Sequence, residues 1–183
     1  MAWEVWLAYA VACVVIAVSP GSGAVLSMSH GLAYGVQRTT PTILGLQIGL
    51  VIVLLIAGVG VGAVLVATAE AGEAITASSG LPSVRQRLVI GTMTNLTNPK
   101  GIVFMVAVLP QFIDPNRPLA LQLLILALTM SVVDIAVMHG YAFLASRAQR
   151  WLASARARRA QNRVFGGVLM AMGASLLLVK RAA

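Results

Sequence analysis

Charged residues are scarce in this chain of 183 residues, and acidic residues are the scarcest. Asp, Glu, Lys and Arg together make up 10% of the sequence, whereas a soluble globular protein carries about 25%. Hydrophobic residues make up 59%, and the mean hydropathy is +0.91. So few charges cannot solvate the surface of a folded domain, and lipid must therefore cover much of it. The length suits a single membrane domain over residues 1–183.

Cysteine, histidine and acidic residues are too few for most reactive sites. Cys13 is the only cysteine, which excludes an internal disulfide, and we expect it to be a buried packing thiol. With two histidines and five acidic residues, the sequence shows no metal-ligand spacing, no nucleophile–base grouping and no phosphate-binding loop. We therefore expect no metal, no cofactor and no enzymatic activity. A membrane-embedded enzyme is an alternative against which the missing cluster of acids or histidines argues.

Basic residues outnumber acidic ones by 13 to 5, but they are unevenly placed. Six of the thirteen lie between Arg147 and Arg163, where no acidic residue occurs. They do not alternate with aromatic residues, so the pattern does not suit nucleic-acid binding. Beside an apolar segment, such a run is typical of a cytoplasmic loop. The N-terminal segment carries Glu4 and neither Lys nor Arg, so we expect the N-terminus to lie outside.

Long apolar runs define the organisation of the chain. A helix needs about 20 apolar residues to cross the hydrocarbon core of a bilayer. The first run lacks the basic start of a signal peptide and is too long for one, so we predict that it is a span. The fold class is therefore an all-α, polytopic integral membrane helical bundle. We expect five hydrophobic segments with broken helices, the third of them broken or re-entrant: residues 5–28, 42–68, 88–113, 119–146 and 164–179.

Glycines in the second segment indicate how it packs. At 100° per residue, Gly45 and Gly49 project to one side of a helix, and Gly58 projects to roughly the opposite side. Small residues on both faces are typical of a helix packed between two neighbours. The stretches His30–Pro41 and Ala69–Arg87, on either side of this segment, are predicted to be connections.

Two apolar segments are interrupted by a polar residue followed by proline. The first break is Ser19-Pro20-Gly21, and the second is Asn98-Pro99-Lys100. Proline removes a backbone donor, which is tolerated at membrane depth where the break faces protein or a wet cavity. Transporters often place discontinuous helices at matching positions of two halves, where the free helix ends bind substrate or ions. The spacing alone leaves two interpretations open, a binding site between the breaks or two ordinary proline kinks.

Two charged residues lie inside the apolar segments. Lys100 directly follows the second break, and we expect it either to bind a substrate carboxylate or to extend to a lipid headgroup. Asp134 lies near the middle of the fourth segment, where a carboxylate can exchange a proton or pair with a substrate amine. The alternatives for Asp134 are a structural ion pair, for example with Lys100, or a position nearer the membrane interface. Gln47, Asn95 and His139 are interpreted as structural residues.

Four stretches resemble the LysE/RhtB family of amino-acid exporters. They are Ser19–Gly21, the glycine-spaced run His30–Gly49, the block NLTNPKGIVFMVAVLPQF at Asn95–Phe112, and the C-terminal run Asn162–Leu178. The block around the second break is the most specific of them. The resemblance covers most of the chain, and it implies export of amino acids or related metabolites across a bacterial cytoplasmic membrane, driven by an ion gradient.

Two features differ from the usual pattern of that family. The family reads proline-glycine-proline at the first break, whereas Pro20-Gly21 is followed here by Ser22 and Gly23. The family also carries a third hydrophobic segment before the second break, which makes six segments in two inverted halves. Here that place holds the polar stretch Ala69–Arg87. The chain thus resembles a short exporter without segment three, and a homo-oligomer is one way to restore the lost packing.

Charge placement bears on the missing segment. With Arg38 and the loop Arg147–Arg163 inside, the block 88–113 is expected to begin and end on the outer side. Arg85 and Arg87 conflict with this, because they prefer the inner side, where a third segment would put them. We therefore expect the block to form a re-entrant hairpin with its apex at the second break, or to be completed by a neighbouring subunit.

The sequence predicts a proton-coupled secondary transporter that exports amino acids or related small metabolites across the bacterial cytoplasmic (inner) membrane. Its partners would be that substrate and membrane lipid, without nucleic acid. The alternative is a non-transporting scaffold or accessory protein derived from such an exporter. We expect the substrate between the two breaks and Asp134 to be the coupling residue, with the substrate contacted by Ser19, Pro20, Gly21, Asn98, Pro99 and Lys100.

Overall fold

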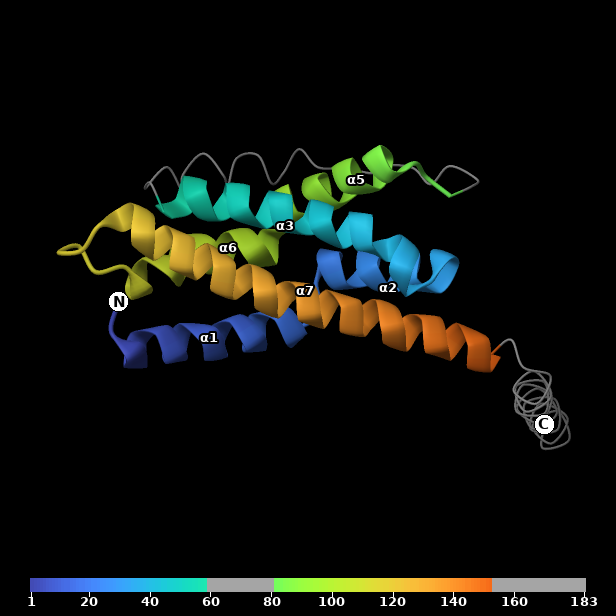
Figure 1. The fold of residues 1–183 in the computed structure, drawn as a ribbon, viewed down its shortest axis with the longest axis horizontal. Coiled ribbons are helices and arrows are strands. Elements are labelled where there is room, and N and C mark those ends of the chain that lie inside the picture. Colours follow the sequence, from blue (N-terminus) through green and yellow to red (C-terminus); the bar gives the residue numbers. More distant parts are fainter. Residues whose placement is uncertain (59–80, 153–183) are drawn as a thin grey trace, which may run out of the picture. The chain divides into compact units, whose positions relative to one another are not determined.

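The computed structural model describes residues 1–58 and 81–152, and these residues are helical wherever they form regular structure, with no strand in either range. The predicted all-α class is therefore confirmed. Met1–Ser146 form one compact unit, to which all contacts described below belong. The elements are α1 (Trp3–Val18), α2 (Ser22–Tyr34), α3 (Val36–Gly58), α5 (Val84–Leu96), α6 (Pro99–Ala107), the 3-10 helix η1 (Leu109–Phe112) and α7 (Leu119–Leu152) (Figure 1).

Two of these helices are long and apolar enough to cross a bilayer, by length and composition. They are α3 and the part of α7 that covers Leu119–Gln149. The pair α1 and α2 meets the same criteria when the two helices are taken together, as a broken span or a re-entrant loop bent by 55°. The predicted segments 5–28 and 119–146 thus correspond to helices, and α3 matches the described part of 42–68. The predicted last segment, 164–179, lies outside the described residues.

The predicted connection His30–Pro41 is mostly helical, so this prediction was wrong. Helix α2 continues to Tyr34, and α3 begins at Val36. Gly35 alone separates them, and it has a φ of 79°, in the left-handed region that favours glycine. Proline at position 41 lies inside α3. The chain therefore turns between α2 and α3 at a single glycine, whereas the sequence pattern predicted a connection of twelve residues.

Helix α3 packs between two neighbours through its glycines, as predicted. A Cβ atom at Gly45 would collide with the Leu88 backbone of α5, and one at Gly49 would lie 2.6 Å from the Thr92 carbonyl oxygen. On the other side, a Cβ at Gly58 would lie 2.5 Å from the Leu123 side chain of α7. The missing side chains let the backbones of α3 and α5 approach closely, which is a common way to join membrane helices.

Helix α5 runs parallel to α3, with its first turn beside the first turn of α3 (Figure 1). The Arg87 guanidinium donates a hydrogen bond to the Arg38 carbonyl oxygen, and two turns further on Asn95 Nδ2 donates to the Leu46 carbonyl oxygen at 2.7 Å. Gly58 and Val84 therefore lie at opposite ends of α3. Arg87, which the sequence assigned to a polar connection, is only 6% exposed.

This direction overturns the expectation that block 88–113 begins and ends on one side. The block starts in α5 beside Arg38, and continues through α6 and η1 toward the end that holds the N-terminus (Figure 1). It is broken, as predicted, but not a hairpin. The conflict posed by the arginines at positions 85 and 87 disappears, because α5 begins at the same end of Met1–Ser146 as Arg38. Residues 59–80, which connect α3 to α5 in the sequence, lie outside the described ranges.

One cluster of the apolar core packs around Tyr9. Its ring lies 5.1 Å from the Phe112 ring and 6.4 Å from the Phe104 ring, between centroids. Its hydroxyl donates to the Leu126 carbonyl oxygen at 3.2 Å. Cys13, one turn further along α1, is fully buried, as predicted. These contacts join α1, α6, η1 and α7.

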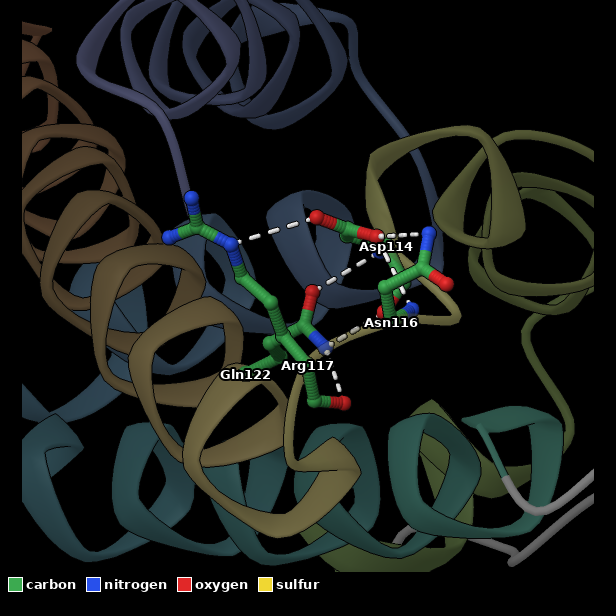
Figure 2. Close-up of polar contacts among 4 residues, drawn as sticks. All are labelled: Asp114, Asn116, Arg117 and Gln122. Carbon is green, nitrogen blue, oxygen red and sulfur yellow. Dashed lines mark hydrogen bonds and ion pairs between the residues drawn. The ribbon is translucent and has the colours of Figure 1, made fainter.

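The turn before α7 is held by side-chain hydrogen bonds (Figure 2). The Asn116 backbone N–H donates to Asp114 Oδ1 at 2.9 Å, and the Arg117 guanidinium pairs with the same carboxylate at 3.2 Å. Gln122 Nε2 donates to the carbonyl oxygens of Asp114 and Arg117. The bond from the Asn116 backbone, aided by its side chain and by Arg117, lowers the pKa of the exposed Asp114 carboxyl. Residues 114–118 thus form a turn that leads from η1 into α7.

Candidate functional site

The first helix break leaves carbonyl groups without partners in their own helix. Helix α1 ends at Val18 and α2 begins at Ser22, with no side-chain cap at either junction. The Lys100 ammonium donates to the Ile16 carbonyl oxygen at 2.7 Å and also to that of Ser19. The Tyr141 hydroxyl donates to the Val18 carbonyl oxygen at 2.6 Å. A cation is well placed there, because the carbonyl end of a helix carries partial negative charge.

The second helix break is capped by its own residues. Asn98 is the N-cap of α6, and its side-chain oxygen accepts a hydrogen bond from the Lys100 backbone N–H at 3.2 Å. Pro99 occupies the first turn, where its missing N–H costs nothing. Asn98 Nδ2 also donates to Asn95 Oδ1 at 3.4 Å. The start of α6 is therefore determined by neighbouring residues, namely the cap at Asn98 and the proline that follows it.

Lys100 joins the two breaks. Its backbone belongs to the first turn of α6, and its side chain ends on the last carbonyl groups of α1. It lies close to Gly21 as well, where an added Cβ would be 3.0 Å from Lys100 Cε and 3.2 Å from Nζ. Two segments separated by about eighty residues thus meet through the Lys100 ammonium group. The ammonium group binds backbone carbonyl groups of the protein, so the alternative in which it extends to a lipid headgroup does not describe this structure.

Asp134 lies in the middle of α7 and is 8% exposed. Gln47 of α3 donates from Nε2 to Asp134 Oδ2 at 2.6 Å. No ion pair within 4.0 Å joins Asp134 to Lys100, both of which lie in the described part of the chain. The structural ion pair considered as an alternative is therefore not formed in this structure. Gln47 is an interhelical hydrogen-bonding residue, as interpreted, but its partner is the one carboxylate within α7.

A cavity of about 40 Å³ lies between the breaks and Asp134. One buried water needs about 10–15 Å³ on the same measure, so the cavity holds only a few water molecules. Of the seven predicted site residues, Gly21, Asn98, Lys100 and Asp134 line it. Ser19 contributes its carbonyl oxygen to Lys100, and Pro20 and Pro99 are not in the lining. The remaining lining residues are Ile16, Ala17, Gly23, Ala24, Leu46, Leu50, Val53, Asn95, Gly101, Met105, Met130 and Met138.

Two ionisable groups of opposite type, one basic and one acidic, line the otherwise largely apolar cavity. Lys100 supplies an ammonium group and Asp134 a carboxyl group, while Asn95 and Asn98 add neutral amides. Leucine and methionine side chains make up much of the rest. A small zwitterion with an uncharged side chain is complementary to this combination. No group of three His, Cys, Asp or Glu side chains that could hold a metal ion occurs within residues 1–58 and 81–152.

Sequence reasoning missed Tyr141 and did not assign His139 a partner. Tyr141 follows Asp134 by seven residues, so it lies on the same helical face after two turns, and this spacing could have identified it. His139 Nδ1 lies 2.9 Å from the Ile135 carbonyl oxygen, and Nε2 lies 3.3 Å from Thr40 Oγ1. His139 is not in the cavity lining, which agrees with its interpretation as a structural residue.

The fold and the comparisons with known proteins define the class of this chain. It is a helical membrane protein in which two helix breaks contribute to one small, largely apolar cavity that also contains a lysine and an aspartate. Residues 68–180 match the family model described as LysE type translocator. The chain belongs to the LysE family of translocators. No solved structure matches it.

Full-length relatives agree with that assignment. A homoserine/homoserine lactone efflux protein of Salmonella typhi is 36% identical, and its Salmonella typhimurium counterpart is 35% identical, each alignment covering all of both chains. An uncharacterized membrane protein of Vibrio cholerae is 38% identical over 97% of this chain and 98% of its own length. The alignments with the efflux proteins run over 206 positions, which is 206 − 183 = 23 more than this chain has. About 23 residues of each efflux protein therefore have no counterpart in this chain.

Proposed function

We propose that this protein exports amino acids or closely related small metabolites from the bacterial cytoplasm, coupled to the proton gradient. One observation carries the proposal: an ammonium group and a carboxyl group line the same cavity, at the junction of two broken helices. Lys100 would bind the substrate carboxylate, and Asp134 would exchange the proton. The names of the two efflux relatives support a homoserine-like substrate.

Transport requires that the cavity widen, because it now holds only a few waters. We expect this widening at the α1–α2 junction, since its free carbonyl groups are held by Lys100 and Tyr141 rather than by side chains of the junction itself. A substrate carboxylate that attracts Lys100 would release the Ile16 and Ser19 carbonyl groups. Binding and opening would then be linked through one side chain.

The proposed test is uptake of labelled homoserine into inverted membrane vesicles under an imposed pH gradient. Wild-type protein is expected to drive uptake, and Asp134→Asn to lose gradient-driven uptake while still binding homoserine. Arg117→Ala, which removes an exposed ion pair far from the cavity, is the matched control and should transport normally. Gradient-driven uptake by Asp134→Asn equal to that of wild type would remove the coupling role.

The length difference favours one competing function, a non-transporting scaffold or accessory protein. We propose that the 23 absent positions correspond to the third hydrophobic segment of the family. If its loss abolished transport, wild-type vesicles would show no uptake of homoserine or of other neutral amino acids, although the protein is present in the membrane. Uptake above that of empty vesicles would exclude this alternative.

The orientation is also a proposal. The end of Met1–Ser146 that holds Arg38, Arg85 and Arg87 would face the cytoplasm, because short basic loops are retained there. The N-terminus and Asn116 would then lie outside. In a Cys13→Ala background, an impermeant thiol reagent applied to whole cells is expected to label Asn116→Cys but not Ser83→Cys, and the reverse pattern would contradict the orientation.

A further inference from the structure

The Gln47 amide uses only one of its two ends. Its Nε2 donates to Asp134 Oδ2 at 2.6 Å, but its Oε1 is buried and has no hydrogen-bond partner among the described residues. Gln47 itself is only 7% exposed. A buried acceptor without a partner is costly, because it has lost its hydrogen bonds to water. Because this acceptor lies beside the Asp134 carboxyl group, we ask in which protonation state of Asp134 it would accept a hydrogen bond.

Protonation of Asp134 provides that state. An ionised carboxylate can only accept hydrogen bonds, whereas a protonated carboxyl group also donates one. An amide carries a donor and an acceptor at opposite ends of a nearly symmetric group, so a half-turn of the amide exchanges them. With Nε2 toward Asp134, Gln47 suits the ionised form. With Oε1 toward it, the same side chain accepts the hydrogen bond of the protonated form.

The backbone that carries Gln47 is held in place on the other side of α3. Gly45 and Gly49 lie against the α5 backbone, and Asn95 Nδ2 donates to the Leu46 carbonyl oxygen at 2.7 Å. Thr92 Oγ1 also donates to the Gly45 carbonyl oxygen at 3.1 Å. Helix α3 therefore cannot rotate easily about its axis at this level, and the Gln47 side chain approaches Asp134 from a fixed position.

We infer that Gln47 is a positioning residue that holds Asp134 at the cavity in both of its protonation states and sets the pH at which transport responds. This inference rests on the proposed function, in which Asp134 carries the coupled proton. Gln47 does not line the cavity, so it acts on the substrate only through Asp134.

Other charged and titratable groups around Asp134 are few within the described part of the chain. Lys100 of α6 lines the same cavity, and the buried Cys13 thiol of α1 lies within electrostatic range of Asp134. The cavity residues contributed by α2, α3 and α5 are uncharged. Because neither Lys100 nor Cys13 is changed in the variants below, any shift in the pH response is assigned to Gln47.

The test is the pH dependence of homoserine uptake by Gln47→Met, which keeps the length of the side chain and removes both polar atoms. The ionised form of Asp134 loses a charge-assisted hydrogen bond, which is about twice as strong as the neutral one lost by the protonated form. Asp134 then stays protonated to higher pH. The pH of half-maximal uptake is expected to rise by about one unit, a tenfold change in proton binding.

A matched control and a second variant make the test decisive. Gln122→Met changes another buried glutamine, at the start of α7 and outside the cavity, and should leave the pH of half-maximal uptake unchanged. If Gln47→Met does not accumulate, Gln47→Glu keeps the shape and places a second carboxyl group beside Asp134. Two adjacent carboxyl groups share one proton, so this variant should shift the response to higher pH by more than Gln47→Met.

Failure of this inference can be told apart from failure of the proposed function. If Asp134→Asn retains gradient-driven uptake, Asp134 does not carry the proton and the proposed function fails. If Asp134→Asn loses it but Gln47→Met and Gln47→Glu keep the wild-type pH response, the proposed function stands. Gln47 is then a packing residue and the inference is overturned.

Discussion

The two helix breaks look alike in sequence but are stabilised in different ways. The second break is satisfied locally, since Asn98 caps α6 and Pro99 occupies a position that needs no donor. The first break has no side-chain cap of its own, and the carbonyl groups of Ile16, Val18 and Ser19 are held by Lys100 and Tyr141, from helices far away in the sequence. The first break therefore depends on tertiary contacts, which a substrate would alter under the proposed function, whereas the second break is held by its own residues.

Removal of the contact that joins the breaks is expected to have the largest effect. Lys100→Ala leaves the Ile16 and Ser19 carbonyl groups without their cation and removes the positive end of the cavity. Export should fall by about tenfold or more, since a hydrogen bond to a charged group contributes roughly 1.5–3 kcal/mol. Export and the amount of protein in the membrane should be measured together, and normal export by this variant would show that the contact between Lys100 and the first break is not needed for transport.

A pair of glycine substitutions tests the comparison more finely. Gly21→Ala at the first break puts a methyl group 3.0 Å from Lys100 Cε, which displaces the ammonium group from its carbonyl partners. We expect export to fall by about fivefold, the equivalent of an overpacking cost of about 1 kcal/mol. Gly101→Ala at the second break is the matched variant, because its nearest contact would be an ordinary 3.8 Å. Equal effects of the two variants would mean that the breaks do not differ in function.

The smallest effect is expected from a single hydroxyl group at the first break. Tyr141→Phe keeps the ring and removes the hydrogen bond to the Val18 carbonyl oxygen. In membrane proteins such a bond contributes about 0.6 kcal/mol, so export should change by about threefold or less. The thermal midpoint of the purified protein should fall by only a few degrees. A loss as large as that of Lys100→Ala would show that Tyr141, not Lys100, is the main support of the break.

The sequence predicted the two breaks well because their cause is local. Proline cannot donate, and polar residues beside it either cap a helix or face a cavity, so Ser19–Gly21 and Asn98–Lys100 could be identified without knowledge of the packing. Both breaks contribute residues to the same cavity, and the substrate site expected between them stays a prediction. Gly45, Gly49 and Gly58 likewise indicated the two neighbours of α3, since a missing side chain marks a close approach.

Other features depended on tertiary contacts that no local pattern carries. The connection at 30–41 was predicted too long, because the single positive φ at Gly35 completes the reversal. The prediction of where block 88–113 begins was wrong because it was based on a charge count. In the structure, the packing of α5 against α3 places their first turns side by side. The partnership of Gln47 with Asp134 joins residues 87 positions apart, so the sequence marked both residues without showing that they meet.

The central claim is that substrate passes through the cavity between the breaks, and thiol protection tests it most directly. Met130 lines the cavity from α7 and is 5% exposed, whereas Asn116 lies in the exposed turn before α7. In a Cys13→Ala background, the rate of labelling by a small thiol reagent is measured with and without homoserine. The account predicts that homoserine slows labelling of Met130→Cys and leaves Asn116→Cys unchanged. Labelling of Met130→Cys at the same rate with and without substrate, in protein that still transports, would contradict it.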